Sequence, residues 1–171
     1  MDLRVVKTKR AIKDAFLQLR NNFPLEKVRV KDICEIAVIN KTTFYKYYQD
    51  IYALEAEMEN EAIDLVIESF ETKADIFSDP FRFITGLPNA LDANRELLQP
   101  LFQENLDKLF ILLERRLKSC YSTSDYTDVE DILLTFVIGG TLHTLRTMKC
   151  ERNCDDIILA KGVSEIISKI Q

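Results

Sequence analysis

The sequence predicts an all-α fold, and its composition and hydrophobic periodicity both indicate it. Only four glycines and four prolines occur among 171 residues, which is too few for a turn-rich β protein. Leu, Ile, Glu and Lys dominate instead, and these residues favour helices. Apolar residues also recur at helical spacing, as at Ile12, Ala15, Phe16 and Leu19.

Three helices are expected in the first fifty residues. The first runs from Val5 to Asn21 and ends before Pro24, which cannot continue a helix. The second runs from about Lys31 to Ala37, and a short turn leads to the third, Lys41 to Tyr47. Asn40 ends that turn, and its side-chain oxygen can accept a hydrogen bond from an early backbone N–H of the third helix.

The later helices are delimited by caps, prolines and a polar loop. Asp50 is a candidate N-cap for a long helix over about 51–73, and Asp79-Pro80 marks the next start, because proline is tolerated in a first turn. Pro88 and Pro100 punctuate a middle region of shorter helices. The remaining helices are expected over 101–120, 129–149 and 155–170.

The last two expected helices are the most apolar. The first contains LLTFVIGGTLHTL, which is apolar almost all round, and the second is rich in Ile, Leu and Val. A helix that is apolar on every side must be covered on every side, and a second copy of the chain is a natural cover. The adjacent glycines 139 and 140 permit close helix approach across a two-fold axis or open space for a ligand. The expected interface residues are Phe136, Gly139, Gly140, His143, Leu159, Val163 and Ile166.

Charge is distributed unevenly along the chain. The net charge is −5, but residues 1–47 hold eleven Lys/Arg and five Asp/Glu, a balance of +6. Residues 48–171 hold twelve against twenty-three, a balance of −11. This asymmetry indicates a basic binding head, residues 1–50, on an acidic body, residues 51–171.

The third helix concentrates hydrogen-bond donors. Phe44 and Tyr48 lie four residues apart and can anchor the helix to the two before it. The other side chains can then face outward, as suits a helix in a DNA groove. The simpler interpretation is a solvated basic face with locally packed tyrosines. The donors are Lys41, Thr42, Thr43, Tyr45, Lys46 and Tyr47.

This segment resembles the DNA-binding domain of the TetR family of transcriptional regulators, over about residues 7–55. The resemblance implies about nine helices: a three-helix helix-turn-helix head, and a ligand-binding and dimerisation body whose last two helices form a four-helix interface. The segment FVIGGTLHTLRTMKCERNCDDIILAKGV is more weakly similar to regulators linked to dihydroxyacetone kinase. The residues that carry the main match are Ile33, Ala37, Asn40, Thr43, Phe44, Tyr45, Tyr48 and Leu54.

The resemblance also implies which residues contact DNA. Bases and phosphates would be contacted from the third helix, and backbone phosphate from the start of the second. Lys46 falls at a variable position that could read guanine, a frequent partner of lysine in the major groove. The expected DNA-binding residues are Arg29, Lys31, Asn40, Lys41, Thr42, Thr43, Tyr45, Lys46 and Tyr47.

Three positions depart from the family pattern. Val38 replaces the favoured turn glycine, so a left-handed backbone there would be strained. Arg29 replaces the usual Ser or Thr cap of the second helix, and Ile51 replaces a lysine that contacts phosphate. We therefore expect weakened or altered DNA binding rather than none.

The body offers candidates for an effector pocket but none for catalysis. His143, the only histidine, is either a core or interface residue or an effector contact. Cys150 and Cys154 alone are a weak indication of metal or thiol sensing, and neither a metal nor a cofactor is expected. The chain has no P-loop, GxSxG or zinc-hydrolase motif, so no catalytic residues are expected. The candidate pocket residues are Phe81, Phe102, Phe110 and His143, although aromatic residues at helical spacing are more often core.

These observations predict a homodimeric transcriptional regulator that binds a palindromic double-stranded operator. We expect a repressor that a small-molecule effector releases. The alternative is a protein-interaction module or coactivator that has kept the head and acts through a protein partner. Four scattered cysteines, no secretory signal and no apolar run near 18 residues indicate a cytoplasmic protein without a membrane segment.

Overall fold

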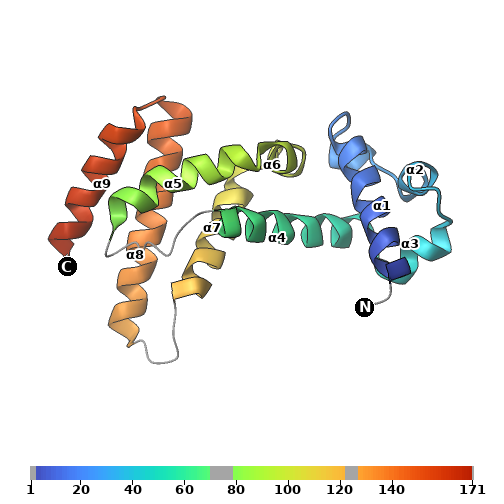
Figure 1. The fold of residues 1–171 in the computed structure, drawn as a ribbon, viewed down its shortest axis with the longest axis horizontal. Helices are drawn as coiled ribbons and strands as arrows, with labels where there is room; N and C mark the ends of the chain where they lie inside the picture. The colour runs from blue at the N-terminus through green and yellow to red at the C-terminus, as the bar shows by residue number, and fades with distance from the viewer. Residues whose placement is uncertain (1–2, 70–78, 122–126, 171) are drawn as a thin grey trace. The chain divides into compact units, whose positions relative to one another are not determined.

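The computed structural model describes residues 3–69, 79–121 and 127–170 of the chain, and all regular structure in these ranges is helical (Figure 1). This confirms the predicted fold class. A 3₁₀ turn (Leu25–Lys27) precedes the second helix, and a π-helical turn (Arg146–Glu151) precedes the last. The α-helices of the described ranges are α1 (Leu3–Arg20), α2 (Val30–Ile36), α3 (Lys41–Tyr47), α4 (Ile51–Ser69), α5 (Pro80–Ala93), α6 (Arg95–Phe102), α7 (Leu106–Tyr121), α8 (Asp128–Leu145) and α9 (Asp156–Ile170).

The chain divides into two compact units. The first comprises residues 1–62 together with 96–105, and the second comprises 63–95 together with 106–171. Helix α6 therefore belongs with the N-terminal helices, although it follows α5 in the sequence. A functional boundary near residue 50 remains a prediction.

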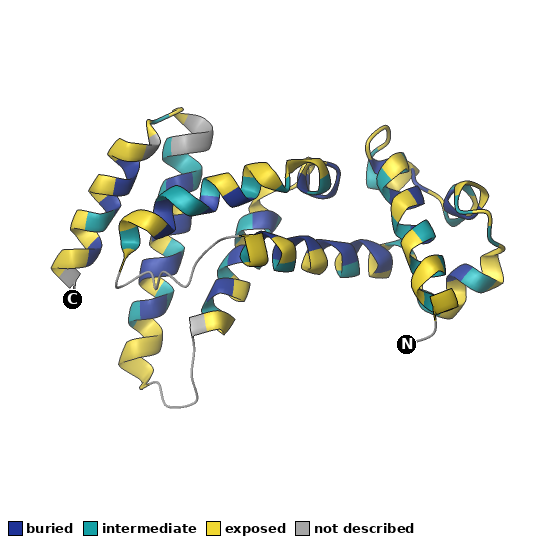
Figure 2. Cartoon of the chain, in the orientation of Figure 1, coloured by how far each residue is buried: buried dark blue, intermediate teal, exposed yellow. Residues whose placement is uncertain are grey.

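The first unit has an apolar core. Helix α6 contributes buried side chains to it, as α1 to α4 do (Figure 2). Burying each large side chain stabilises the fold by about 1.5–3 kcal/mol, so the buried side chains of α6 contribute to the stability of this unit. The buried apolar side chains are Ile12, Ala15, Phe16, Val28, Ile33, Cys34, Phe44, Tyr48, Leu54, Met58, Ala62, Leu98, Leu101 and Phe102.

The second unit packs α5 against α9 and α7 against α8. Its core includes Phe83 and Leu87 from α5, Leu113 from α7 and Ile138 from α8. An ion pair also joins α7 to the end of α4, with Arg116 Nε 2.6 Å from an Asp64 carboxylate oxygen. None of the helices in the described ranges is long and apolar enough to cross a membrane.

The caps predicted at Asn40 and Asp50 are confirmed, and Asp79, predicted only to mark a helix start, also acts as a cap. Asn40 Oδ1 accepts a hydrogen bond from the Thr43 backbone N–H at 2.7 Å, at the start of α3. Asp50 Oδ1 accepts from the Ala53 backbone N–H at 2.7 Å, and Asp79 Oδ1 accepts from Arg82 N at 3.1 Å. Each of these short polar side chains satisfies a backbone donor that the helix itself leaves unpaired.

The middle of the chain differs from the sequence-based expectation. The helix expected over 101–120 is two helices, because the chain turns at 103–105 between α6 and α7. Pro88 and Pro100 lie inside α5 and α6 rather than between helices. In α5 the buried face continues on both sides of Pro88, so apolar burial offsets the hydrogen bond that proline removes. The predicted continuation of α4 to residue 73 lies outside the described residues.

Candidate nucleic-acid interface

Helices α2 and α3 form a helix-turn-helix, and a Schellman motif shapes the turn. The Ile39 backbone N–H donates to the Cys34 carbonyl at 3.0 Å, and the Val38 N–H donates to the Glu35 carbonyl at 3.4 Å. This pair of bonds requires a left-handed residue just after the helix, a place that glycine usually fills. Here Val38 fills it with φ 53°.

The backbone at Val38 is strained, as the missing glycine predicts. The left-handed conformation costs an L-residue on the order of 1–2 kcal/mol, and a β-branched side chain makes it rarer still. The Val38 side chain is 88% exposed, so apolar burial does not offset that cost. The turn is therefore formed against the local preference of its residue.

Helix α3 turns its apolar side into the first unit and its donors outward. Phe44 is fully buried, and its ring centroid lies 5.5 Å from that of Tyr45 and 5.8 Å from that of Tyr48. Tyr45 is 55% exposed, and Lys46 Nζ lies 5.9 Å from the Tyr47 ring centroid. Of the predicted DNA-binding residues on α3, Lys41, Thr42, Tyr45 and Lys46 are exposed, and Thr43 and Tyr47 are half-buried.

Two of the predicted contact residues on or near this surface also have structural bonds. Asn40 caps α3, and its Oδ1 also accepts from the Thr43 hydroxyl at 2.9 Å. That bond orients Thr43 and gives it a structural role at the start of α3. DNA contact by either residue remains a prediction.

The start of α2 presents two exposed cations. Arg29 occupies the N-cap position, and its side chain makes no capping hydrogen bond. Lys31 pairs with Glu35 one turn later, with Lys31 Nζ 3.5 Å from a carboxylate oxygen. Because both partners of such an exposed pair are solvated, the pair contributes at most about 1 kcal/mol and leaves Lys31 available to a phosphate. Ile51, at the start of α4, is half-buried and brings no charge.

A charged cluster fixes the end of α3 to α4 and α1. Tyr48, the C-cap of α3, donates its hydroxyl proton to Glu57 Oε1 at 2.9 Å. Lys9 Nζ lies 2.9 Å from the same oxygen, and Lys13 Nζ lies 2.8 Å from it. Lys13 also reaches Glu61 at 2.5 Å. We call Lys9, Lys13, Tyr48, Glu57 and Glu61 the Glu57 cluster.

The Glu57 cluster shifts the pKa values of its members. Burial by itself would raise the pKa of the Glu57 carboxyl, but hydrogen bonds from the two lysines and the tyrosine outweigh it and lower the pKa to about 2. Burial and the neighbouring Glu57 carboxylate both raise the pKa of Tyr48. Burial opposes the charge of Lys13, yet its bonds to Glu57 and Glu61 raise its pKa. At neutral pH the cluster thus keeps the Glu57 carboxylate beside cationic Lys13 and the neutral Tyr48 phenol.

Sequence reasoning did not find this cluster. Lys9 and Lys13 lie one turn apart on α1, as do Glu57 and Glu61 on α4, and this matched spacing is the sequence signal that could have indicated ion pairs between the two helices.

The net charge of +6 over residues 1–47 overstates the positive charge that the head presents to solvent. Lys9, Lys13 and Arg20 are engaged with carboxylates inside the first unit.

The four residues predicted to line an effector pocket do not share one unit. Phe102 is buried in the core of the first unit. Phe81, Phe110 and His143 belong to the second unit, where Phe81 and His143 are exposed and Phe110 is half-buried. A pocket formed by these residues remains a prediction.

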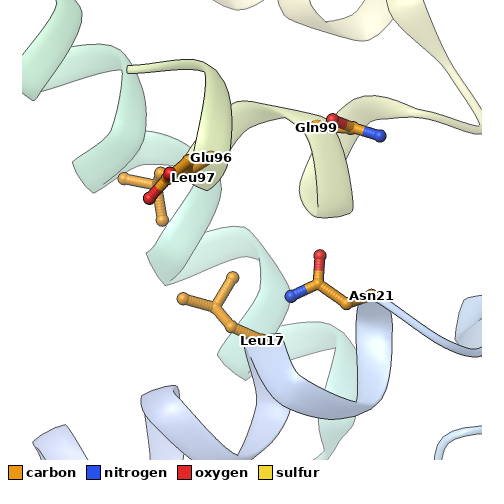
Figure 3. Close-up of a pocket in the computed structure, with 5 residues that line it drawn as sticks. All are labelled: Leu17, Asn21, Glu96, Leu97 and Gln99. Atoms are coloured by element: carbon orange, nitrogen blue, oxygen red, sulfur yellow. The ribbon is translucent and has the colours of Figure 1, made fainter. Parts of the chain in front are cut away.

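The first unit contains an open hollow of about 510 Å³ between α1 and α6 (Figure 3). Two leucines, two amides and one carboxylate line it, and none of the predicted pocket residues is among them. The hollow is a surface groove rather than an enclosed cavity. Its lining residues are Leu17, Asn21, Glu96, Leu97 and Gln99.

The residues predicted to form a dimer interface fall into two groups. Phe136, Gly140 and His143 are exposed, and their spacing of four and three places them on one face of α8. Ile166 is exposed on α9. Leu159 and Val163, in contrast, are buried in the core of their own chain, because α9 packs this side against α5.

Gly139 faces its own chain. A Cβ atom added at this position would lie 3.5 Å from a Glu114 carboxylate oxygen of α7, which is an ordinary contact distance. The side chain of Cys150 lies outside the described residues, so the thiol pair with Cys154 stays a prediction. The described residues contain no group of three or more His, Cys, Asp or Glu side chains placed to hold a metal ion.

Comparison with known proteins supports the fold. No protein-family model and no curated protein matches the sequence. Among solved structures, the chain is similar to the dihydroxyacetone kinase operon activator DhaS, with a TM-score of 0.54 and 20% sequence identity. The match covers 95% of this chain and 94% of that one, so the similarity extends over the whole helical arrangement.

Proposed function

We propose that the chain is a DNA-binding transcriptional regulator that acts as a homodimer. The observation that carries the proposal is α3, a short helix held at both ends with most of its donors exposed. Asn40 caps its start, and the Tyr48–Glu57 bond holds its end. A helix that enters a DNA groove must present donors from a rigid base, because flexible donors lose entropy on binding.

In this proposal each subunit places Lys41 to Tyr47 in the major groove of one half-site. Lys41 and Arg29 contact phosphate, and Lys46 reads a guanine edge. A two-fold dimer reads a palindrome whose half-sites lie roughly 34–36 Å apart, about one helical turn of DNA. The similar solved structure is named an operon activator, which agrees with a role in transcription.

The second copy covers an exposed apolar face of α8 and α9. Phe136 is 65% exposed on α8, and Ile158 and Ile166 are 66% and 57% exposed on α9. Gly140 and Gly162 lie on the same faces, and no heavy atom comes within 4 Å of a Cβ added to either. Large apolar side chains left exposed at helical spacing fit an association site, and the glycines admit close helix approach.

In this proposal, regulation couples effector binding in the body to the arrangement of the two heads in the dimer. A small-molecule effector that binds the body favours one arrangement of the heads only through a difference in its affinity for the two arrangements. We propose repression relieved by such an effector as the simplest mode. A reporter gene controlled by the selected operator tests whether the protein represses or activates transcription. Reporter output that falls when the protein is present supports repression, and output that rises indicates activation.

The experiment that tests DNA binding is selection of bound sequences from random double-stranded DNA. We expect a palindrome enriched over successive rounds, with half-sites about one helical turn apart. Selection of no sequence at low salt would contradict the proposal.

The alternative, a protein-interaction module, is motivated by three departures in the head. Val38 strains the turn, Arg29 provides no cap, and Ile51 removes a cation. This alternative predicts no specific DNA shift at low salt and a partner protein that co-purifies with the chain. The selection experiment therefore discriminates the two functions.

A further inference from the structure

A buried arginine ends helix α1. Arg20 is 1% exposed, and a buried guanidinium needs charged or hydrogen-bonding partners. Its Nη2 donates to Glu104 Oε2 at 3.0 Å, and its Nη1 donates to the Phe23 carbonyl at 3.1 Å. Its Nε lies 3.7 Å from Glu55 Oε1 of α4.

The turn after α6 binds both the side chain and the backbone of this arginine. Gln103 Nε2 donates to the Arg20 carbonyl at 3.0 Å, while Glu104 accepts from its guanidinium. The two partners lie 83 and 84 residues beyond Arg20 in the sequence. The Gln103 bond satisfies a carbonyl that the end of α1 would otherwise leave unpaired.

The Glu57 cluster links the position of α1 to the position of α3. Two lysines of α1 hold Glu57, and Glu57 in turn accepts the hydroxyl proton of Tyr48 at the end of α3. A shift of α1 along its axis would move the cluster and thus the anchor of α3. The turn at 103–105 therefore has a continuous path of bonds to the helix that presents the donors.

We propose that Glu104 and Gln103 are positioning residues for DNA binding. Through Arg20, they hold the end of α1 in the position in which α3 can present its donors to DNA. The inference rests on the proposed function, and it makes a segment more than fifty residues beyond α3 part of the DNA-binding machinery. Glu104 is the better residue to test, because its side chain is 39% exposed and its removal does not open the core.

The test uses the full chain and the DNA fragment that selection yields. Glu104→Ala should weaken binding to that fragment about fivefold, since a charge-assisted hydrogen bond is removed and the competent head conformation becomes less populated. Binding to unrelated DNA of equal length should change less, so the ratio of specific to non-specific affinity falls. Glu104→Gln keeps an acceptor oxygen and should regain most of the specific affinity. Gln103→Ala should weaken specific binding in the same direction.

Glu96→Ala is the matched control. It removes the same charge from α6, on the side that lines the open hollow, and should leave the specific affinity unchanged. Equal losses in the Glu96 and Glu104 variants would show that the effect does not depend on the contact with Arg20, and would overturn the inference. So would a Glu104→Ala protein with a lower melting temperature and unchanged DNA affinity and specificity at 25 °C. If the unchanged chain selects no DNA, the proposed function itself fails, which is a distinct result.

Discussion

The Tyr48 hydroxyl donates to Glu57 Oε1 at 2.9 Å, and this bond ties the last turn of α3 to α4. Tyr48 is buried and Glu57 is half-buried, and Lys9 approaches both, since its Nζ lies 5.2 Å from the Tyr48 ring centroid and 2.9 Å from Glu57. The anchor combines a hydrogen bond, ion pairs and a cation–π contact. It therefore holds the donor-bearing helix more firmly than apolar packing alone.

Removing the phenol oxygen should destabilise the fold without emptying the core. We expect Tyr48→Phe to lower the free energy of unfolding by about 1 kcal/mol, because Glu57 keeps its lysine partners. Urea denaturation at pH 7 measures the change. Tyr45→Phe removes the same atom from an exposed ring and should leave the midpoint unchanged. Equal midpoints for wild type and Tyr48→Phe would show that the bond adds nothing.

The Glu57 cluster should make stability depend on acid pH. The pKa of Glu57 is lowered from 4.5 to about 2 in the folded state. Because its pKa is lowered, the ionised Glu57 carboxylate stabilises the fold above pH 4.5. This contribution to the free energy of unfolding disappears as the pH falls from 4.5 toward 2. Glu57→Gln should be less stable than wild type at pH 7, and the difference should narrow between pH 5 and pH 3. A difference independent of pH would assign the destabilisation to packing.

Relieving the strain at residue 38 should stabilise the head. We expect Val38→Gly to raise the free energy of unfolding by about 1 kcal/mol, because glycine adopts the left-handed region without a Cβ clash. Val38→Ala keeps the Cβ and should gain much less. Thermal unfolding of the three proteins tests this. A less stable glycine variant would mean that backbone entropy in the unfolded chain outweighs the strain.

Neutralising Lys41 should weaken DNA binding, because its charge is expected to pair with a phosphate. If Lys41 binds one phosphate, Lys41→Ala should make the plot of log affinity against log salt concentration shallower by about 1. Fluorescence anisotropy across a salt series measures this slope. Lys118→Ala removes an equal charge from α7 in the second unit and should leave the slope unchanged. An unaltered slope for Lys41→Ala would exclude phosphate binding by this residue.

Introducing a charge on the exposed face of α8 should dissociate the dimer. We expect Phe136→Glu to be monomeric at a micromolar concentration at which wild type is dimeric, because removing a buried aromatic anchor costs on the order of 2 kcal/mol or more. Light scattering measures the mass. Ile111→Glu places the same charge on an equally exposed apolar site of α7 and should remain dimeric. A monomeric wild type would overturn the interface.

The sequence by itself determined the features that depend on near neighbours in the chain. Helical periodicity and the caps at Asn40 and Asp50 predicted where α3 and α4 begin, since a cap acts within three residues. The Asp79-Pro80 pair predicted the start of α5, because proline is tolerated in a first turn. The strain at Val38 was predictable for the same reason. The outward position of Lys41 and Tyr45 followed from the spacing of Phe44 and Tyr48.

Only the tertiary structure decided which distant segments share a unit. The helix expected from residue 101 proved to be two helices, and α6 belongs with the N-terminal unit. The contacts of Lys9 with Glu57 and of Arg20 with Glu104 join residues 48 and 84 positions apart. Periodicity and capping carry no information about such pairs, because they arise from the packing of whole helices. The same packing turned Leu159 and Val163 inward and left Ile158 and Ile166 exposed.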